Sequence, residues 1–553
     1  MNSQRSYSGF FVAGIVAVLL LIITGFYWFF GKIPVKLSTP ITQPGGAVFV
    51  SKAAPIMVSL LVNPTGLQSL DQQGEFAQIK NSLFAQTKIN FTKDIQPWLG
   101  NEVTLAVTSD DIDHIANNGI QPGYLMLLAT NNPSKSKEFV ELLFSQRALA
   151  GANLEVQKYK GIKLLYDTQT VEKSVSSHPN NLASAVVGNF VLFANHPKVV
   201  REAINNVQAP NVNLKSYLDY QKAIKELPKN ALAMAFLNLD KVAQWQGLDL
   251  IDPTYQSQIT SLVLKPQGLL AESTFFSTSS VENVSKLQDK PVQALQYIPE
   301  SAGVAITGNN LANLTNSNLG KLWQQGTTAI YGSPQEAINR LFKPIDKLQT
   351  KWNLNLGADI FDWVTGEYAL AILPNSENTQ TSWVFVVEKS PNLGSGLNNL
   401  DRIANDNSLN ASSIFLNNQT VTAWTELIAQ NNDDKTAVNV ETKVKGVRAS
   451  IDNYAIFASD LEVIKNILTD LEKPLRENQE FQNDLAAIPQ PNQGYVYIDW
   501  EKSQDFLESQ QPLVKFVKLL GKPLFNHLRS LTMSSYGEET GMLKGGMFLH
   551  LEK

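Results

Sequence analysis

The chain has 553 residues, no cysteine and a formal net charge of −5 at pH 7. Without cysteine it has no disulfide framework, no thiol catalysis and no cysteine-ligated metal site. The acidic balance argues against a nucleic-acid-binding protein, because such proteins carry basic surfaces. We therefore expect no nucleic acid among its partners.

A membrane anchor is the first element predicted along the chain. Residues 10–30 carry no charge and read FFVAGIVAVLLLIITGFYWFF. About 20 such residues cross the ~30 Å hydrocarbon layer of a bilayer, and the aromatic cluster at the end suits the membrane interface. A cleaved signal peptide fits less well, because its apolar core spans only about 7–15 residues before a small-x-small cleavage site. We expect residues 10–30 to be an uncleaved transmembrane helix embedded in the lipid bilayer.

The orientation of this anchor rests on its flanks. Residues 1–9 form a short tail containing Arg5, whereas Lys32, Lys36 and Lys52 follow the helix, so the charge bias is weak. The short tail favours a cytoplasmic N-terminus. Only 17% of the residues are charged, which suits a body outside the cytoplasm. We predict a single-pass protein with its bulk on the far side of the membrane.

An internal duplication follows a linker at residues 31–45. Residues 94–107 and 359–372 share Asp, Ile, Trp, Glu, Leu and Ala in order, as DIQPWLGNEVTLAV and DIFDWVTGEYALAI. Self-similarity of this kind indicates repeated structural units. We predict one unit at residues 46–285 and a second at residues 290–553.

Five further segments of the two halves match in the same order. They are residues 124–129 and 383–387, 160–163 and 445–448, 189–194 and 453–458, 220–228 and 481–489, and 268–275 and 541–548. Short β-rich runs predict strands, and dipeptides that tolerate positive φ predict tight turns between them. These dipeptides are Lys160-Gly161, Gly188-Asn189, Lys445-Gly446 and Asp452-Asn453.

Helical periodicity completes the fold prediction. Apolar residues recur at helical spacing in residues 136–148, 197–207, 217–227, 462–471 and 479–488. Strands joined by tight turns and mixed with helices indicate antiparallel sheets rather than a doubly wound parallel sheet. The predicted fold class is α+β, with an N-terminal transmembrane helix followed by two tandem units, each a mainly antiparallel sheet with packed helices.

The DIxPWLGxE-type motif, the spacing of hairpins and helices, and the N-terminal anchor together resemble an uncharacterised bacterial family. Its members are common in cyanobacteria and carry a domain-of-unknown-function label. The resemblance implies a membrane-tethered extracytoplasmic protein and supplies no catalytic residues. A cyanobacterial source would place the bulk of the chain in the periplasm or the thylakoid lumen.

The repeated Asp–Trp–Glu motif is the sharpest candidate for chemistry. Asp94 with Glu102, or Asp359 with Glu367, could form an acid–base pair. A structural role explains the same positions: the aspartate would cap a helical turn, the tryptophan, Trp98 or its counterpart, would pack in the core, and the glutamate would begin a strand. We favour the structural interpretation.

Four other patterns are weaker candidates. The acidic run at residues 110–114, DDIDH, could bind a hard cation, but it lacks the EF-hand spacing and suits a hydrated loop. The glycine-containing segment 391–399 imitates a phosphate loop without its third glycine, which favours a strand–helix connection. Ser134-Lys135-Ser136-Lys137 matches Ser-x-x-Lys without the partner motifs of penicillin-recognising enzymes. The histidines lack zinc spacing and are His114, His178, His196, His527 and His550.

These observations predict no catalytic residue, no cofactor and no metal. The leading hypothesis is a non-enzymatic, membrane-anchored scaffold, assembly or interaction protein, whose partner is an envelope or photosynthetic-membrane protein. A carrier or sensor of an apolar or lipid ligand is the first alternative. A hydrolase whose site is assembled from distant residues is the second.

Overall fold

The structure is a computed structural model. It describes residues 43–61, 91–112, 121–168, 182–246, 254–277, 287–331, 354–374, 381–417, 419–431, 438–469, 473–510, 522–539 and 541–552. The predicted anchor at residues 10–30 and the linker up to residue 42 lie outside these ranges. No helix within them has the length and hydrophobicity needed to cross a membrane.

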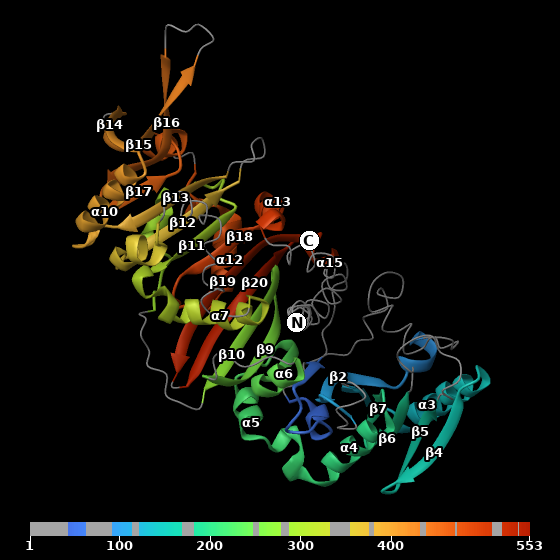
Figure 1. Cartoon of the computed structure of the whole chain (residues 1–553). Helices are drawn as coiled ribbons and strands as arrows, with labels where there is room; N and C mark the ends of the chain where they lie inside the picture. Colours follow the sequence, from blue (N-terminus) through green and yellow to red (C-terminus); the bar gives the residue numbers. More distant parts are fainter. Residues whose placement is uncertain are drawn as a thin grey trace, which may run out of the picture.

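The described strands form one antiparallel sheet, and helices pack on it (Figure 1). The predicted α+β class is therefore confirmed. The strands of the first half are β1 (Ile56–Leu60), β2 (Leu99–Ser109), β3 (Gly123–Thr130), β4 (Asn153–Tyr159), β5 (Ile162–Thr168), β6 (Ala183–Val187), β7 (Phe190–Ala194), β8 (Ala231–Asn238), β9 (Tyr255–Lys265) and β10 (Gly268–Ser277). Those of the second half are β11 (Val304–Asn309), β12 (Glu367–Leu373), β13 (Ser382–Glu388), β14 (Asn410–Leu416), β15 (Gln419–Asn431), β16 (Val438–Ile451), β17 (Tyr454–Ala458), β18 (Tyr495–Asp499), β19 (Leu528–Glu539) and β20 (Met542–Leu551).

The two halves have the same strand order. Across the first half the neighbours run β4-β5-β6-β7-β3-β2-β1-β8-β9-β10. Across the second half they run β14-β15-β16-β17-β13-β12-β11-β18-β19-β20. Each strand of one half therefore has a counterpart at the same place in the other.

The last strands of the two halves join them. β10 pairs antiparallel with β20, from Gly268 opposite His550 to Phe276 opposite Met542. Because counterpart strands meet antiparallel, the join has a local twofold relation. A Cβ at Gly268 would lie 1.9 Å from the carbonyl oxygen of Leu549, so only glycine fits there. The sequence predicted two sheets and not their fusion into one.

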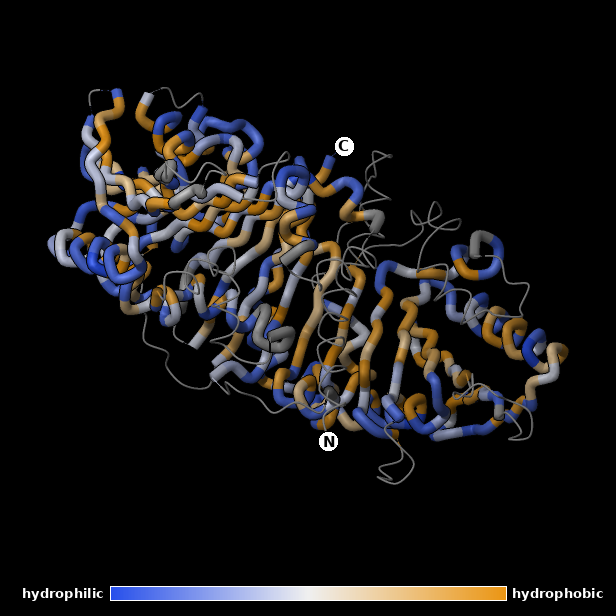
Figure 2. The backbone as a smooth tube through the Cα atoms, turned by 45° about the horizontal axis from the view of Figure 1, so that its top comes forward, coloured by the Kyte–Doolittle hydropathy of each residue, from blue (hydrophilic) through white to orange (hydrophobic). Residues whose placement is uncertain are grey.

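Helices cover both faces of this sheet. In the first half these are α3 (Pro133–Leu149), α4 (Pro197–Gln208), α5 (Leu218–Lys225) and α6 (Leu239–Gln246). In the second half they are α7 (Asn318–Tyr331), α10 (Leu393–Asp406), α11 (Leu461–Thr469), α12 (Gln479–Ala487), α13 (Trp500–Gln510) and α15 (Lys522–Phe525). Hydrophobic stretches follow the strands of the sheet, and hydrophilic ones are frequent in the covering elements (Figure 2).

Alternation along the strands supplies a core on each face. In the first half, Leu127 and Leu192 pack with α4 and α5, whereas the adjacent Leu128 and Val191 pack with α3. Successive side chains of a strand point to opposite faces. The second half likewise has one core beneath α11 and α12 and another beneath α10.

Local sequence explains where the helices begin. Asn132 accepts a hydrogen bond from the N–H of Lys135, and Pro133 occupies the first position of α3. Asn478 caps α12 in the same way, by accepting from the N–H of Phe481. All five predicted helices are present, as α3, α4, α5, α11 and α12.

Three of the four predicted turns are confirmed, and one is wrong. Lys160-Gly161, Gly188-Asn189 and Asp452-Asn453 each join two adjacent strands and contain positive φ. Lys445-Gly446 instead lies inside β16, where the register with β15 shifts next to Trp424. Neither residue has positive φ, so the irregularity is a β-bulge within the strand and not the tight turn that the dipeptide predicted. The match between residues 160–163 and 445–448 therefore joins strands that are not counterparts.

Candidate functional site

Glu102 of β2 is a buried glutamate whose carboxylate accepts hydrogen bonds from the backbone at the start of the first half. Its Oε2 accepts from the N–H of Gly45 at 2.7 Å, and its Oε1 accepts from the N–H of Gly46 at 2.8 Å. Oε1 also accepts from the hydroxyl of Thr104 at 2.8 Å. Both glycines belong to the short helical turn η1 (Gly45–Val48). The carboxylate thus satisfies N–H groups that a helix start leaves unpaired.

Burial determines the electrostatics of this group. Only 2% of Glu102 is exposed, and desolvation raises the pKa of its carboxyl above the ordinary value. The hydrogen bonds from Gly46, Thr104 and Gly45 oppose this shift. A Cβ at Gly46 would lie 2.8 Å from Oε1 of Glu102, so the close contact requires glycine.

Glu367, the first residue of β12, makes the corresponding contacts in the second half. Its Oε2 accepts from the N–H groups of Gln293 at 2.7 Å and Ala294 at 3.3 Å. Both donors lie in the short helical turn η7 (Gln293–Tyr297). The hydroxyl of Tyr454 donates to the same oxygen at 3.0 Å. In both halves, therefore, the repeated glutamate ties the chain before the first strand to the sheet.

A groove of about 490 Å³ lies beside Glu102. Its other lining residues are all neutral: Gln43, Gly45, Gly100, Asn101, Ala129, Thr130, Asn131, Asn189 and Phe190. Acid–base catalysis by a carboxylate pair needs a second titratable group in the same cleft. Among the described residues, no second titratable side chain lines the groove beside Glu102.

The repeated tryptophans are core residues, as predicted. Trp98 is 1% exposed and packs against Phe139 of α3, with ring centroids 5.2 Å apart. Trp363 is 7% exposed and packs against Phe457 of β17 at 6.2 Å. Each indole N–H donates to a backbone carbonyl four residues earlier, at 2.6 Å and 2.7 Å respectively. This bond satisfies the polar atom of a buried ring.

The aspartates of the motif lie inside short helical turns. Asp94 lies in η3 (Phe91–Ile95), and Asp359 lies in η10 (Leu356–Ile360), whose cap is Asn355. The carboxylate of Asp359 accepts from the N–H of Asn355 at 2.8 Å and from the side chain of Asn399 at 3.0 Å. The capping role predicted for the aspartate is wrong for Asp359, because Asn355 begins the turn four residues earlier.

The two carboxylates of the motif bind different groups. Asp359 binds its own helical turn and α10, whereas Glu367 binds η7 and Tyr454. Glu102 likewise binds η1 and Thr104. These contacts support the structural interpretation of the Asp–Trp–Glu motif over an acid–base pair.

The acidic run is described only as far as residue 112. Asp110 accepts from the N–H of Asp111 at 3.1 Å, and Asp111 accepts from the N–H of Gln121 at 3.2 Å. Both carboxylates therefore accept from backbone N–H groups. Over the residues that the structure describes, no group of three or more His, Asp or Glu side chains is placed to hold a metal.

The two remaining motifs lie at helix starts. Gly394 and Gly396 of the glycine-containing segment are already inside α10, where they form no phosphate loop. A Cβ at Gly396 would lie 2.6 Å from the ring of Trp363, so this glycine allows the helix to pack on the indole. Ser136, in the Ser-x-x-Lys match, donates to the carbonyl of Pro133 at 3.0 Å within α3.

A buried polar cluster in the second half was missed by the sequence analysis. Asp484 of α12 is fully buried, and its Oδ1 lies 2.6 Å from Nδ1 of His550 on β20. Ser530 and Thr532 of β19 donate their hydroxyls to Oδ2. The hydrogen bond to Asp484 raises the pKa of His550 above its ordinary value. At the matching position of the first half stands Ala223.

This cluster differs from a hydrolytic triad. In a triad the serine donates to the histidine, which acts as its base. Here the hydroxyl of Ser530 donates to Asp484 instead. Both Asp484 and His550 are buried, at 0% and 8% exposure. The arrangement fixes α12 to β19 and β20.

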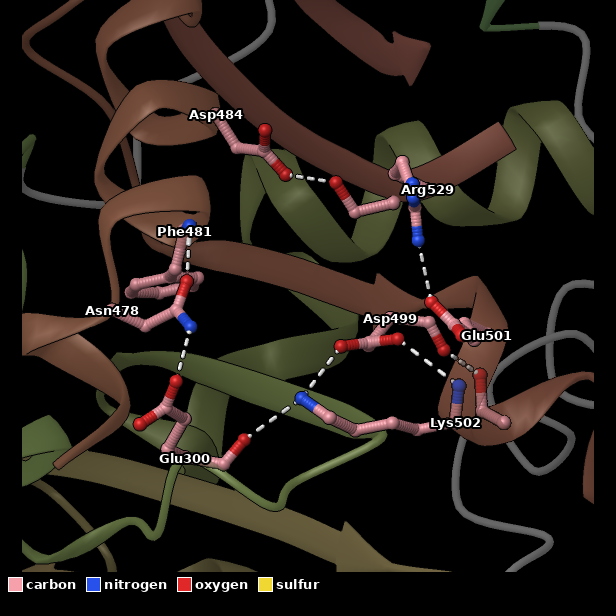
Figure 3. Close-up of polar contacts among 10 residues, drawn as sticks. Glu300, Asn478, Phe481, Asp484, Asp499, Glu501, Lys502 and Arg529 are labelled. Atoms are coloured by element: carbon pink, nitrogen blue, oxygen red, sulfur yellow. Dashed lines mark hydrogen bonds and ion pairs between the residues drawn. The ribbon is translucent and has the colours of Figure 1, made fainter. Parts of the chain in front are cut away.

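Ion pairs lie near this cluster, and Asp499, a member of one of them, is buried (Figure 3). Lys502 binds Asp499 at 2.7 Å and the backbone carbonyl of Glu300 at 3.0 Å. Arg529, beside Ser530 in sequence, binds Glu501 and Glu552 at 2.6 Å each. Lys502 and Glu501 connect α13 to β18 and β19. The two pairs of Arg529 involve exposed carboxylates, so each is worth little stability.

An apolar cavity of about 60 Å³ lies beside Trp363 in the second half. It is lined by side chains of the core beneath α10: Leu311, Leu354, Leu356, Ile360, Phe361, Trp363, Tyr368, Leu370, Trp383, Phe385, Leu400, Trp424 and Phe457. By comparison, an apolar cavity that binds benzene has a volume of roughly 150 Å³. In this structure the cavity is therefore too small for a lipid chain.

Together these features define an α+β protein in which two halves of equal strand order share one antiparallel sheet. Over residues 11–551 the chain matches a family described as "Protein of unknown function (DUF3352)", and it belongs to that family. A search among curated proteins gave no match.

Two solved structures show weak similarity. Crystal forms I and IV of TP0453 each share 11% identity with this chain at a TM-score of 0.24. The alignments cover 44% and 42% of this chain and 82% and 80% of those chains. Similarity at this level carries no argument about fold or function.

Proposed function

We propose that the protein is a non-enzymatic scaffold, assembly or interaction protein, anchored in a membrane by residues 10–30. Its N-terminal tail lies in the cytoplasm and its bulk in the periplasm or thylakoid lumen. The observation that carries this proposal is the fusion of both halves into one extended sheet through β10 and β20. A continuous sheet holds the outer surfaces of the two halves in a fixed relation, as a scaffold requires.

Two units, at residues 46–285 and 290–553, make up this scaffold. The identical strand order of the two halves supports their origin by duplication. Their repeated polar residues support a non-catalytic role, because Glu102 and Glu367 bind backbone N–H groups at the start of each half. If the two units serve as binding surfaces, both must keep their fold, and contacts that stabilise the fold are then expected in both halves.

The topology can be tested with protease. Added to right-side-out vesicles or opened lumenal preparations, protease should digest the chain beyond about Lys32. Digestion only from the cytoplasmic face would contradict the proposed orientation. Crosslinking in intact membranes, followed by identification of the captured proteins, should yield an envelope or photosynthetic-membrane partner.

Absence of turnover chemistry can be tested with amide substitutions. The variant combines Asp94→Asn, Glu102→Gln, Asp359→Asn and Glu367→Gln in cells. Any phenotype should follow the abundance and unfolding midpoint of the variant, because the carboxylates act on structure. A folded variant of normal abundance that behaves like a deletion would indicate carboxylate chemistry. Glu141→Gln, which removes an exposed ion pair to Lys163, serves as a neutral control.

An apolar or lipid ligand is the second candidate, favoured by the wholly apolar lining of the cavity beside Trp363. The cavity would have to open to admit a chain, because about 60 Å³ is too small. Solvent extraction of the protein purified from membranes, with mass spectrometry of the extract, tests this. One lipid bound at a fixed ratio, and lost on Leu400→Trp, would favour the carrier over the scaffold.

A further inference from the structure

We infer that β14 forms an intermolecular edge, pairing antiparallel with β14 of a second copy of this chain. This inference rests on the scaffold proposal and adds a second copy as a partner. The two ends of the sheet are β4 and β14, which lie at opposite ends of the molecule in Figure 1. Within the described part of the chain, β4 pairs with β5 alone, and β14 pairs with β15 alone.

The two ends differ in how they are protected. An open edge presents unpaired N–H and C=O groups, and proteins usually guard such edges with charged residues or proline. β4 carries Glu155 and Lys158, both exposed. β14 reads NASSIFL and contains neither charge nor proline. Because the two strands occupy the same place in their halves, this contrast is a property of β14 and not of the fold.

The exposed face of β14 also carries a large apolar side chain. Ala411, Ser413 and Phe415 alternate on this face, and Phe415 is 73% exposed. The opposite face, with Ile414 and Leu416, packs on the core. An exposed phenylalanine beside open backbone groups combines an apolar anchor with hydrogen-bonding capacity, which is the requirement for strand addition.

The sequence of β14 suits a second β14 better than another strand. In an antiparallel pair centred on Ser413, Phe415 of each copy stands opposite the small Ala411 of the other. On the second face, Ile414 stands opposite Ser412. Large side chains thus meet small ones, and no like charges face each other.

A pairing of this kind closes on itself. It is a twofold contact that uses the β14 edge of each copy, and the two sheet ends that remain are the charged β4 edges. The join of β10 with β20 is an example in the same chain of counterpart strands meeting antiparallel. Pairing of β4 with β14 would instead leave an open edge at each end and would produce fibres.

The absence of cysteine from the chain makes a direct test possible. Ser413→Cys in the full-length protein places one thiol at the twofold axis, opposite itself. Directly opposed residues have Cβ atoms about 4.5–5.5 Å apart, and a disulfide needs about 3.5–4.5 Å, so small adjustments suffice. Val156→Cys on β4 is the matched control, since Val156 is 60% exposed on the protected edge.

We expect mild oxidation in detergent or nanodiscs to link Ser413→Cys into covalent dimers at least tenfold faster than Val156→Cys. Equal rates would overturn the inference. Light scattering supplies the second measurement. The wild-type protein and Val156→Lys should have the mass of a dimer, and Phe415→Lys that of a monomer whose circular dichroism spectrum is unchanged.

A monomeric wild-type protein, or a Phe415→Lys variant that remains dimeric, would also overturn the inference. The second result would assign the dimer to another contact, such as the anchor. If a monomeric protein still crosslinks to envelope partners, the scaffold proposal stands without the β14 contact. If the protein dimerises through β14 but captures no other partner, the scaffold proposal fails and the contact remains.

Discussion

Asp484 and His550 lie with Oδ1 and Nδ1 2.6 Å apart, in a cluster that only the second half possesses. The hydrogen bond to Asp484 raises the pKa of His550, burial opposes this shift, and the charges of Asp484 and Glu480 add to it. Because the folded-state pKa is above the ordinary 6.5, this histidine contributes stability fully below about pH 6.5. The contribution is lost as the pH rises through the raised value.

His550→Gln should therefore destabilise the protein more at pH 6 than at pH 9. The measurement is the difference in unfolding free energy between wild type and variant across this range. His527→Gln, elsewhere in the same half, controls for loss of a histidine. A difference that grows with pH would contradict the assignment of a charged pair with Asp484.

Glu102→Ala should cost more stability than Glu367→Ala. Removal of the buried carboxylate takes away the acceptor of three donors, which are the N–H groups of Gly45 and Gly46 and the hydroxyl of Thr104. An unsatisfied buried donor costs about 1–3 kcal/mol. Glu367 is only half-buried, so water can replace it in part. Denaturant unfolding measures both, and an equal or reversed order would show that burial does not determine the cost.

The Trp98 indole contributes both volume and one hydrogen bond. Trp98→Ala should lose about 3–5 kcal/mol, because it leaves a cavity in the core beneath α3. Trp98→Phe keeps most of the ring and loses the bond to the carbonyl of Asp94, so it should lose about 1 kcal/mol from that bond plus a smaller packing term. Trp363→Ala and Trp363→Phe should follow the same order. If a Phe variant loses as much unfolding free energy as its Ala counterpart, the hydrogen bond and not the ring volume accounts for most of the loss.

Gly396→Ala and Gly394→Ala should have opposite effects although they lie in the same helix. The new methyl at residue 396 would lie 2.6 Å from the ring of Trp363, whereas at residue 394 it meets nothing within 4 Å. Overpacking costs about 1–3 kcal/mol. Gly394→Ala should instead stabilise by about 0.4–1 kcal/mol, by restricting the unfolded chain. The measurement is the thermal unfolding midpoint of each variant. Destabilisation by Gly394→Ala would contradict the absence of neighbouring atoms around a Cβ at residue 394.

Sequence reasoning succeeded where the signal is local. A tight turn such as Gly188-Asn189 needs only one residue that readily adopts positive φ, here Gly188. The burial of Trp98 follows from its large apolar ring. The exception, Lys445-Gly446, shows the limit of that reasoning: a bulge and a turn draw on the same residues, and only the partner strand distinguishes them. The structure places that pair beside Trp424 within β16.

The Asp484 cluster could not be found in this way, because its members come from three elements. Asp484 lies on α12, Ser530 on β19 and His550 on β20, and their proximity depends on strand pairing. One signal was available. The change from Ala223 to Asp484 between matched helices puts a charge at a position that is buried in both halves, and a buried charge requires partners.

The join of β10 with β20 also constrains the order of events during synthesis. When β10 leaves the ribosome, its partner strand has not yet been made, and about half of the chain must follow. At roughly 5–20 residues per second, the delay is tens of seconds. Throughout that time the finished first half presents β10 as a free edge, and Gly268 admits no side chain to shield it. A chain that stops early keeps this edge, so we expect the nascent first half to depend on a chaperone or on rapid completion to avoid pairing with its neighbours.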